Sequence, residues 1–392
     1  MTTATEIHGI CKPGYERIRD AFAQNFEQHG EIGGALSLVV DGETAVDIWG
    51  GSADAAGTRP WEQDTIVNVF STTKGIVTVC ALRLAEEGKL DLDAPVATYW
   101  PEFAQAGKEK ITVRQLMNHR AGLPAVKDIL PLEHSHVWEP LVNALAAQES
   151  WWEPDTAHGY HAVTFGSLVG EVIRRVSGKS VGAFWREEVA EPFGIDFQIG
   201  FGPEQDGRVA EMIPADLATA DPESSFVKAL MNPMSVNFKA FMVTPLMMVN
   251  PTYMNTREWR AAEIPAANGH TTARALARLY GALATGGELE GSHILRPETI
   301  EMARQEQSYG EDVVLMMPTR FGTGFMLDTP EYQVTPTGAL FGHPGLGGSF
   351  GFADPDARIG MGYVMNRMLL PGAEFVDARW QGMLPAIYES VS

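Results

Sequence analysis

The chain has 392 residues, of which 45% are hydrophobic and 20% charged, as in an ordinary folded protein with one large domain or two lobes. Its formal net charge of −21 argues against binding to nucleic acids or to anionic membranes. The first residues lack the positive and apolar parts of a secretory signal, and the 2 cysteines lie far apart in sequence. We therefore expect a cytoplasmic protein with reduced thiols and no membrane contact.

The amino-terminal part of the chain has the pattern of a helix followed by a pair of strands. Apolar residues recur at helical spacing over residues 13–29. The segments 35–40 and 44–49 alternate between apolar and polar residues and flank an Asp-Gly turn. This arrangement predicts a β-hairpin.

The middle of the chain is mainly helical. Apolar stripes at helical spacing predict helices at 75–87, 112–119, 139–148, 164–177, 180–190 and 271–285. Residues 196–265 are irregular instead, because proline and glycine interrupt every pattern. This stretch is rich in methionine and phenylalanine, which fits an adaptable apolar pocket wall as well as it fits plain core filler.

The last part of the chain returns to strands and ends in a helix. The predicted strands and the closing helix lie at 321–327, 338–343, 349–353, 359–366 and 373–389. Strands near both termini with a helical middle predict an α+β fold, in which both ends of the chain build one sheet. We expect residues 1–74 and 286–392 to form this sandwich domain, and residues 75–285 to form a mainly helical lobe.

The sequence S-T-T-K at 71–74 stands between an extended β-branched segment and an apolar helix. Ser71 therefore lies near a helix N-terminus, and Lys74 projects from the same face one turn later. A serine hydroxyl needs a neighbouring base and oxyanion donors to act as a nucleophile, and this arrangement offers both. The alternative is a serine cap beside a solvated lysine. A second S-x-x-K, from Ser225 to Lys228, lacks the preceding strand, and we interpret it as chance.

Tyr160 and the segment 343–348 are further candidates. Tyr160 stands on a loop before a predicted helix and could reach Ser71, where a lysine cation would favour the phenolate as a base. His343 begins a glycine-rich link between predicted strands, where a backbone N–H could complete an oxyanion hole. Taken alone, Tyr160 is more typical of a packing residue, and the segment of a hairpin with a surface histidine.

Other patterns do not carry a function. Residues 347–351 match the G-x-S-x-G nucleophile elbow, but strand follows strand there and no histidine follows Ser349. Closely spaced histidines at positions 134, 136, 158 and 161 lack the neighbouring ligands of a zinc pattern. No phosphate-binding loop or dinucleotide fingerprint is found. We therefore predict neither a metal nor a cofactor.

Ser71-x-x-Lys74, the motif at Tyr160 and the His343-Pro-Gly motif follow one another in an order that resembles the serine β-lactamase and penicillin-binding superfamily. The class C β-lactamase-like family VIII carboxylesterases are the most similar branch. Further similar segments lie at 88–101, 111–124, 166–171 and 268–269. The resemblance implies a β-lactamase-like α+β fold with an antiparallel sheet flanked by the terminal helices. It also implies an inserted helical lobe and an active site in the cleft between the two parts.

The resemblance implies a role for each matching residue. Ser71 would be the acylated nucleophile, and Lys74 and Tyr160 would share the general-base work. The backbone N–H groups of Ser71 and Leu346 would form the oxyanion hole. The implied substrate-binding positions are His343, Gly345 and His161.

Two departures from the family pattern favour an esterase over a β-lactamase. The asparagine of Y-x-N is replaced by Ala162, and His343 stands in place of the lysine of K-T-G. Without these groups the site gains less from an anionic lactam than from a neutral ester. The expected partner is a small-molecule ester. β-Lactam or D-Ala-D-Ala hydrolysis and acyl transfer remain alternatives, and a non-catalytic penicillin-binding-like scaffold is a further one.

Overall fold

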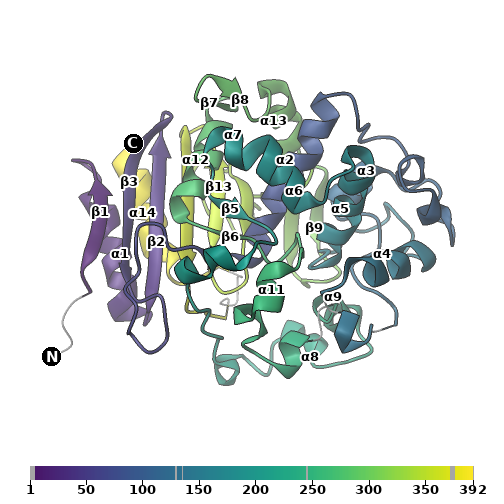
Figure 1. Cartoon of the computed structure of the whole chain (residues 1–392), viewed down its shortest axis with the longest axis horizontal. Helices are drawn as coiled ribbons and strands as arrows, with labels where there is room; N and C mark the ends of the chain where they lie inside the picture. Colours follow the sequence, from purple (N-terminus) through teal and green to yellow (C-terminus); the bar gives the residue numbers. More distant parts are fainter. Residues whose placement is uncertain (1–4, 129, 135, 244–245, 371–375, 392) are drawn as a thin grey trace.

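The computed structural model describes residues 5–128, 130–134, 136–243, 246–370 and 376–391. Within this part of the chain a nine-stranded sheet has the order β1-β3-β2-β14-β13-β12-β11-β10-β9, and each neighbouring pair is antiparallel (Figure 1). The strands are β1 (Ile7–Cys11), β2 (Gly33–Val40), β3 (Glu43–Gly51), β9 (Ser308–Glu311), β10 (Pro318–Phe321), β11 (Met326–Leu327), β12 (Phe341–Pro344), β13 (Phe350–Asp354) and β14 (Ile359–Met365). Because β2 pairs with β14, both ends of the chain build this sheet, as predicted.

Helices cover the sheet. Helices α1 (Glu16–Gln28) and α14 (Trp380–Val391) pack against each other, and α12 (Ala273–Ala284) packs against β14, β13 and β2. A Cβ atom at Gly360 would collide with the backbone of Gly281, so glycine lets α12 lie directly on the sheet. The sequence had placed this helix in the helical lobe. The division into two domains itself stays a prediction.

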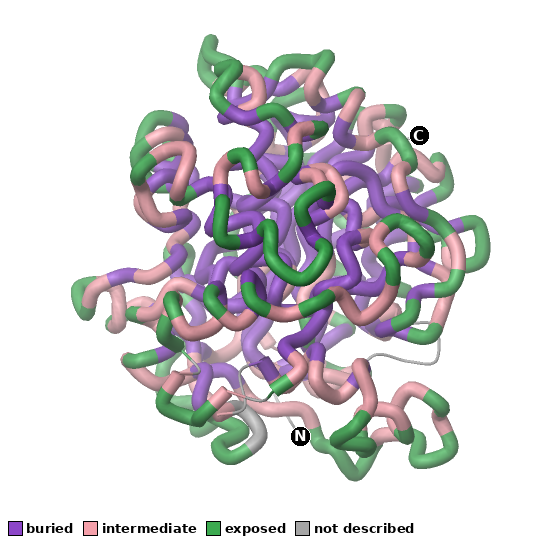
Figure 2. Tube along the Cα trace, turned by 90° about the vertical axis from the view of Figure 1, so that its right-hand side faces the viewer, coloured by how far each residue is buried: buried purple, intermediate pink, exposed green. Residues whose placement is uncertain are grey.

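A second group of helices lies beside the β9 end of the sheet (Figure 1). They include α2 (Thr73–Glu86), α3 (Val113–Met117), α4 (Trp138–Ala147), α5 (Thr164–Ser177) and α6 (Val181–Trp185). Helix α2 is buried on every side over residues 73–82, because α5 and α6 pack against it. Buried residues fill the centre of the molecule, and exposed residues gather on its outer loops (Figure 2).

The structure differs from the sequence-based expectation in short elements. Residues 196–265 contain short helices, including α8 (Ser225–Leu230), α9 (Val236–Phe241), α10 (Leu246–Val249) and α11 (Arg257–Ala261). Strands β1 and β9 were missed, and the strand expected over 321–327 is split between β10 and β11 by a turn. Elements this short show too few repeats of a periodic pattern to be recognised. The closing helix was expected over 373–389. Residues 373–375 lie outside the described residues, 376–379 are not helical, and α14 begins at Trp380.

Smaller elements complete the fold. They are β4 (Val67–Asn68), β5 (Phe197–Gln198), β6 (His270–Thr271), β7 (Glu288–Leu289), β8 (Ser292–His293), α7 (Glu191–Phe193) and α13 (Pro297–Arg304). Cys11 and Cys80 are both free thiols. Over the described residues, no helix is long and apolar enough to cross a membrane.

Candidate active site

Ser71 lies in a single tight turn that joins β4 to helix α2. The turn is a 3₁₀ helix over Phe70–Thr72, and α2 begins at the next residue. Phe70 has a φ of 43°, in the left-handed region that a residue with a side chain rarely adopts. Such local strain is typical of residues at functional sites. The turn presents Ser71 to a cavity, while Thr72 and Thr73 are buried behind it.

Lys74 is fully buried one turn after Ser71. Its Nζ lies 3.0 Å from Ser71 Oγ, 2.7 Å from the carbonyl oxygen of Ala162 and 3.1 Å from that of Ala266. Burial lowers the pKa of the amine well below its ordinary value, and no described carboxylate counteracts this shift. A neutral amine donates two hydrogens to the two carbonyls, which leaves its lone pair for the Ser71 proton. The amine is therefore able to accept a proton from Ser71.

Tyr160 packs on the same amine. Lys74 Nζ lies 4.8 Å from the centre of the Tyr160 ring, and the phenol hydroxyl interacts with Ser71. Burial raises the pKa of the Tyr160 hydroxyl, although the interaction with Ser71 opposes the shift. The sequence suggested a phenolate stabilised by a lysine cation. The structure corrects this, because burial favours the uncharged form of both groups.

Asp312 holds the Tyr160 backbone in place. The Tyr160 N–H donates to both carboxylate oxygens of Asp312 at 3.0 Å, and the N–H groups of Val314 and Leu315 donate at 2.8 Å. The hydroxyl of Thr319 donates at 3.1 Å. Burial raises the pKa of the Asp312 carboxyl, and these donors oppose the shift. Sequence reasoning missed Asp312 because it follows a short strand that was itself missed.

We expect Asp312→Asn to lower kcat by about tenfold or more, since a small misplacement of a catalytic group is costly. The asparagine amide cannot accept the bonds that one carboxylate oxygen now accepts, so the loop of Tyr160 loosens. Steady-state ester hydrolysis measures the effect. Asp354→Asn is the matched control, because Asp354 is also buried and accepts bonds from two backbone N–H groups and from hydroxyls, without contacting Tyr160. A similar loss of kcat in both folded variants would contradict a specific role for Asp312.

The turn between β12 and β13 lies against the Ser71 turn. A Cβ atom at Gly345 would collide with the carbonyl oxygen of Val69 and the Ser349 hydroxyl, so only glycine allows this approach. Ser71 and Leu346 both border the cavity. Among the described residues, neither the Ser71 N–H nor the Leu346 N–H has a hydrogen-bond acceptor. Both donors are therefore available to an oxyanion.

His343 borders the cavity as an uncharged side chain. Its Nδ1 donates to the carbonyl oxygen of Pro344 at 2.6 Å, since a carbonyl can only accept. Burial lowers the pKa of His343 to about 3, so the ring is neutral near pH 7. The Nε2 atom is buried and has no partner among the described residues. His343 thus cannot replace the positive charge of the family's lysine.

His161 does not border the cavity. Its Nε2 accepts the N–H of Leu123 at 3.0 Å, and its Nδ1 lies 2.7 Å from the carbonyl oxygen of Gly159. Both ring nitrogens are thereby occupied, and the side chain is fully buried. The expected substrate contact of His161 is therefore replaced by a structural role in the loop of Tyr160.

The other two serine motifs, G-x-S-x-G at Ser349 and S-x-x-K at Ser225, do not present a serine to the cavity. Ser349 is buried, and its hydroxyl donates to the carbonyl oxygen of Val69 at 2.9 Å. Ser225 begins the short helix α8, and Lys228 forms an exposed ion pair with Glu223. Within the described part of the chain, no three His, Cys, Asp or Glu side chains are grouped as metal ligands.

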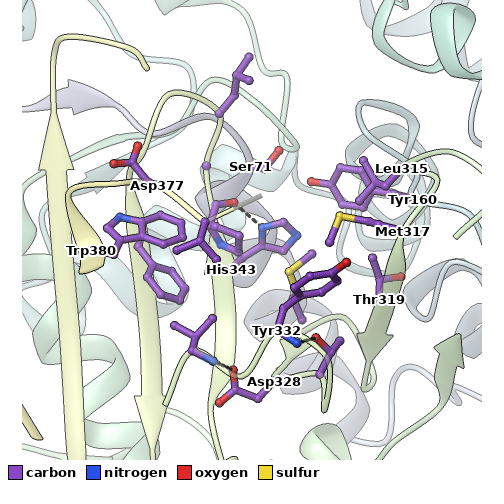
Figure 3. Close-up of a pocket in the computed structure, with 18 of the residues that line it drawn as sticks. Ser71, Tyr160, Leu315, Met317, Thr319, Asp328, Tyr332, His343, Asp377 and Trp380 are labelled. Carbon is purple, nitrogen blue, oxygen red and sulfur yellow. Dashed lines mark hydrogen bonds between the residues drawn. The ribbon is translucent and has the colours of Figure 1, made fainter. Parts of the chain in front are cut away.

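The cavity next to Ser71 has a volume of about 200 Å³ and a mostly apolar wall (Figure 3). Its lining includes Phe241, Leu315, Met317, Met326, Leu340 and Trp380. Phe241 belongs to the methionine- and phenylalanine-rich stretch 196–265. The sequence left open whether this stretch forms a pocket wall or fills the core, and Phe241 contributes to the cavity wall. Of the charged residues in the lining, Asp377 pairs with Arg379 and Arg320 pairs with Glu306, while Asp328 accepts hydrogen bonds from the N–H groups of Val334 and Thr335. Such a cavity suits an uncharged, apolar group.

Comparisons with known proteins agree with this geometry. The β-lactamase family profile matches residues 18–382, so the chain belongs to the β-lactamase family. It is similar to Esterase/beta-lactamase LipL of Mycobacterium tuberculosis, with 38% identity over 376 residues that cover 93% of this chain and 84% of the relative.

Solved structures extend the likeness over almost the whole chain. A family VIII carboxylesterase is 42% identical with a TM-score of 0.88, over 98% of this chain and 100% of that one. A penicillin-binding protein homologue from Caulobacter crescentus is 38% identical with a TM-score of 0.87, with the same coverage of 98% and 100%. The predicted family and the β-lactamase-like fold are confirmed.

Proposed function

We propose that the protein is a carboxylesterase that cleaves small uncharged esters through an acyl-enzyme on Ser71. The observation that carries this proposal is the contact of 3.0 Å between Ser71 Oγ and the buried Lys74 amine, which no described carboxylate neutralises. A nucleophile and a base in contact are needed for covalent catalysis and serve no purpose in a simple binding module. The names of the similar esterases support the same conclusion.

In the first half of the reaction, Lys74 takes the Ser71 proton as Oγ attacks the ester carbonyl. The negative charge on the former carbonyl oxygen lies between the N–H groups of Ser71 and Leu346. The carbon–oxygen bond to the alcohol then breaks. Tyr160 donates its proton to the leaving oxygen and receives the proton held by Lys74, so the alcohol leaves neutral.

In the second half, water takes the place of the alcohol. Tyr160 passes a water proton to Lys74 while the water oxygen attacks the acyl carbon. The same two N–H groups stabilise the second oxyanion. As it collapses, the bond between the acyl carbon and Ser71 Oγ breaks and Lys74 returns its proton to Oγ, which releases the acid and restores the Ser71 hydroxyl and the neutral amine. An alcohol in place of water gives acyl transfer by the same steps.

The charges around Ser71 favour an ester over a β-lactam or a D-Ala-D-Ala peptide. Those two substrates carry a carboxylate, which requires a cation or strong donors in the site. His343 is neutral, and burial lowers the pKa of Lys74 as well. An anionic substrate therefore loses its hydration without gaining a counter-charge.

Mass spectrometry of the intact protein tests the proposal. We expect a serine-directed phosphonate to label Ser71, p-nitrophenyl esters to turn over rapidly, and nitrocefin to turn over slowly. Stable acylation by β-lactams with slow ester cleavage would contradict the proposal and indicate a penicillin-binding or peptidase role. The absence of any adduct and of any turnover would contradict it in favour of a non-catalytic scaffold.

A further inference from the structure

The turn between β12 and β13, residues 345–349, carries the Leu346 N–H and is here called the oxyanion turn. One side of it is joined to the turn that carries the nucleophile. The Ser349 hydroxyl donates to the carbonyl oxygen of Val69 at 2.9 Å and lies 3.1 Å from the hydroxyl oxygen of Thr72. These two residues flank the Phe70–Ser71 pair in the chain. The contact therefore links the two turns that would supply the oxyanion donors.

The opposite side of the oxyanion turn is held by the start of α14. Two consecutive carbonyl oxygens of the turn accept hydrogen bonds from this segment. Arg379 Nη2 donates to Gly347, and Trp380 Nε1 donates to Gly348 at 2.9 Å. The Trp380 ring also stacks on Phe350, with 4.6 Å between the ring centres. The turn is thus clamped between the nucleophile and the carboxyl-terminal helix.

Arg379 is itself rigidly placed. The guanidinium is buried and forms ion pairs with Asp377 at 2.7 Å and with Glu31 at 3.1 Å. It also donates to the carbonyl oxygen of Arg367 at 2.9 Å. Burying a charge with this many partners costs free energy unless the partners fit well, so its position is strongly determined. The fixed guanidinium can therefore hold the backbone of the oxyanion turn in one position.

Gly348 allows the oxyanion turn to lie close to Arg379 and Asp377. Gly348 has a φ of 122°, and a Cβ atom there would collide with Arg379 Nη2 and with the Asp377 carboxylate. The N–H of Gly348 donates to the carbonyl oxygen of Gly345 at 3.1 Å. In a trans peptide the C=O and N–H point in opposite directions, so this bond directs the Leu346 N–H outward from the turn. A shift of Gly348 would therefore tilt the Leu346 N–H.

We propose that Arg379 and Trp380 are positioning residues that hold the Leu346 N–H in the oxyanion hole. The inference rests on the proposed function, because it requires the oxyanion to form at Ser71. Preorganised donors stabilise the transition state only while their direction is maintained. Loosening the clamp therefore lowers the stability of the tetrahedral state and changes substrate binding little.

Trp380→Phe is the sharpest test, because phenylalanine keeps an aromatic ring beside Phe350 and in the cavity wall but lacks the indole donor. Trp185→Phe is the matched control: Trp185 is also buried, and its indole donates to the carbonyl oxygen of Phe197 at the same 2.9 Å. The measurements are kcat and KM with a p-nitrophenyl ester and the inhibition constant of a trifluoromethyl ketone. This ketone forms a tetrahedral oxyanion on the serine.

We expect Trp380→Phe to lower kcat by about tenfold, less than the loss of a whole oxyanion donor, with KM changed less than about twofold. The inhibition constant of the ketone rises by the same factor as kcat/KM falls, because the ketone imitates the transition state. Arg379→Lys keeps the charge but loses the planar fork, so the same pattern is expected with a larger effect. Trp185→Phe leaves the ratio of kcat to KM unchanged.

Unchanged kcat and ketone affinity in folded Trp380→Phe would overturn the inference. So would equal losses in Trp380→Phe and Trp185→Phe, which would indicate general destabilisation. If Arg379→Lys fails to fold, the tryptophan pair still decides the question. The proposed function fails by a different result, the retention of activity without Ser71, so the two failures are distinguishable.

Discussion

Replacing Ser71 by alanine is expected to lower kcat/KM for esters by about 10⁴-fold or more, because no other group can carry the acyl intermediate. The structure indicates that the fold survives. Ser71 borders the cavity, and the neighbouring hydroxyls of Thr72 and Thr73 make the structural contacts of the turn. Covalent labelling by the phosphonate is lost together with turnover. Steady-state kinetics and the intact-protein mass measure both effects.

The chain supplies a matched control for this variant. Ser225 begins the second S-x-x-K sequence, on the short helix α8 and away from the cavity lining. Ser225→Ala should leave ester turnover and labelling unchanged. Ser71→Ala with activity near that of the unaltered protein would refute the acyl-enzyme at this residue.

Replacing Lys74 by arginine or methionine is expected to lower kcat by about 10³-fold, within the range for loss of a general base. Arginine retains a positive charge but does not release its proton, so it cannot accept one from Ser71. Methionine fills a similar volume without a lone pair of comparable basicity. Lys228→Met, in the exposed second motif, serves as the control for the loss of a lysine.

The two Lys74 variants distinguish a base from a charge. If the positive charge of Lys74 were the important property, Lys74→Arg would keep much of the activity while Lys74→Met would not. Our proposal requires both to be inactive and both to remain folded by circular dichroism. Retained activity in the arginine variant would contradict Lys74 as the base and would indicate that Tyr160 is the base instead.

The pH dependence of kcat/KM gives an independent check on the same residue. Only the unprotonated amine of Lys74 can act as a base, so the active fraction grows as the pH rises through the pKa of Lys74. Burial lowers this pKa well below the usual value of about 10.4, so the rise should be complete well below that pH. A rise centred on the ordinary lysine pKa would contradict a buried neutral amine. Burial raises the pKa of Tyr160, so the phenol stays protonated across the same range.

The sequence by itself predicted the contact between Ser71 and Lys74, because their spacing is local. Ser71 and Lys74 are three residues apart, and any helix brings positions with this separation to one face. The pairing of both chain ends in one sheet followed from strand patterns at the two termini. The order of the short motifs was enough to identify the family. These are properties that single segments carry with them.

The tertiary structure alone decided which groups surround those residues and in what ionisation state. The burial of Lys74 depends on α5 and α6 packing against α2, and on carbonyl groups from Ala162 and Ala266, which are 88 and 192 residues away in the chain. Asp312 and Arg379 lie in segments with no motif of their own. A pKa depends on dielectric surroundings and on partners distant in sequence, and a hydrogen bond depends on direction. Neither quantity is encoded in residue spacing, so only the packed chain reveals them.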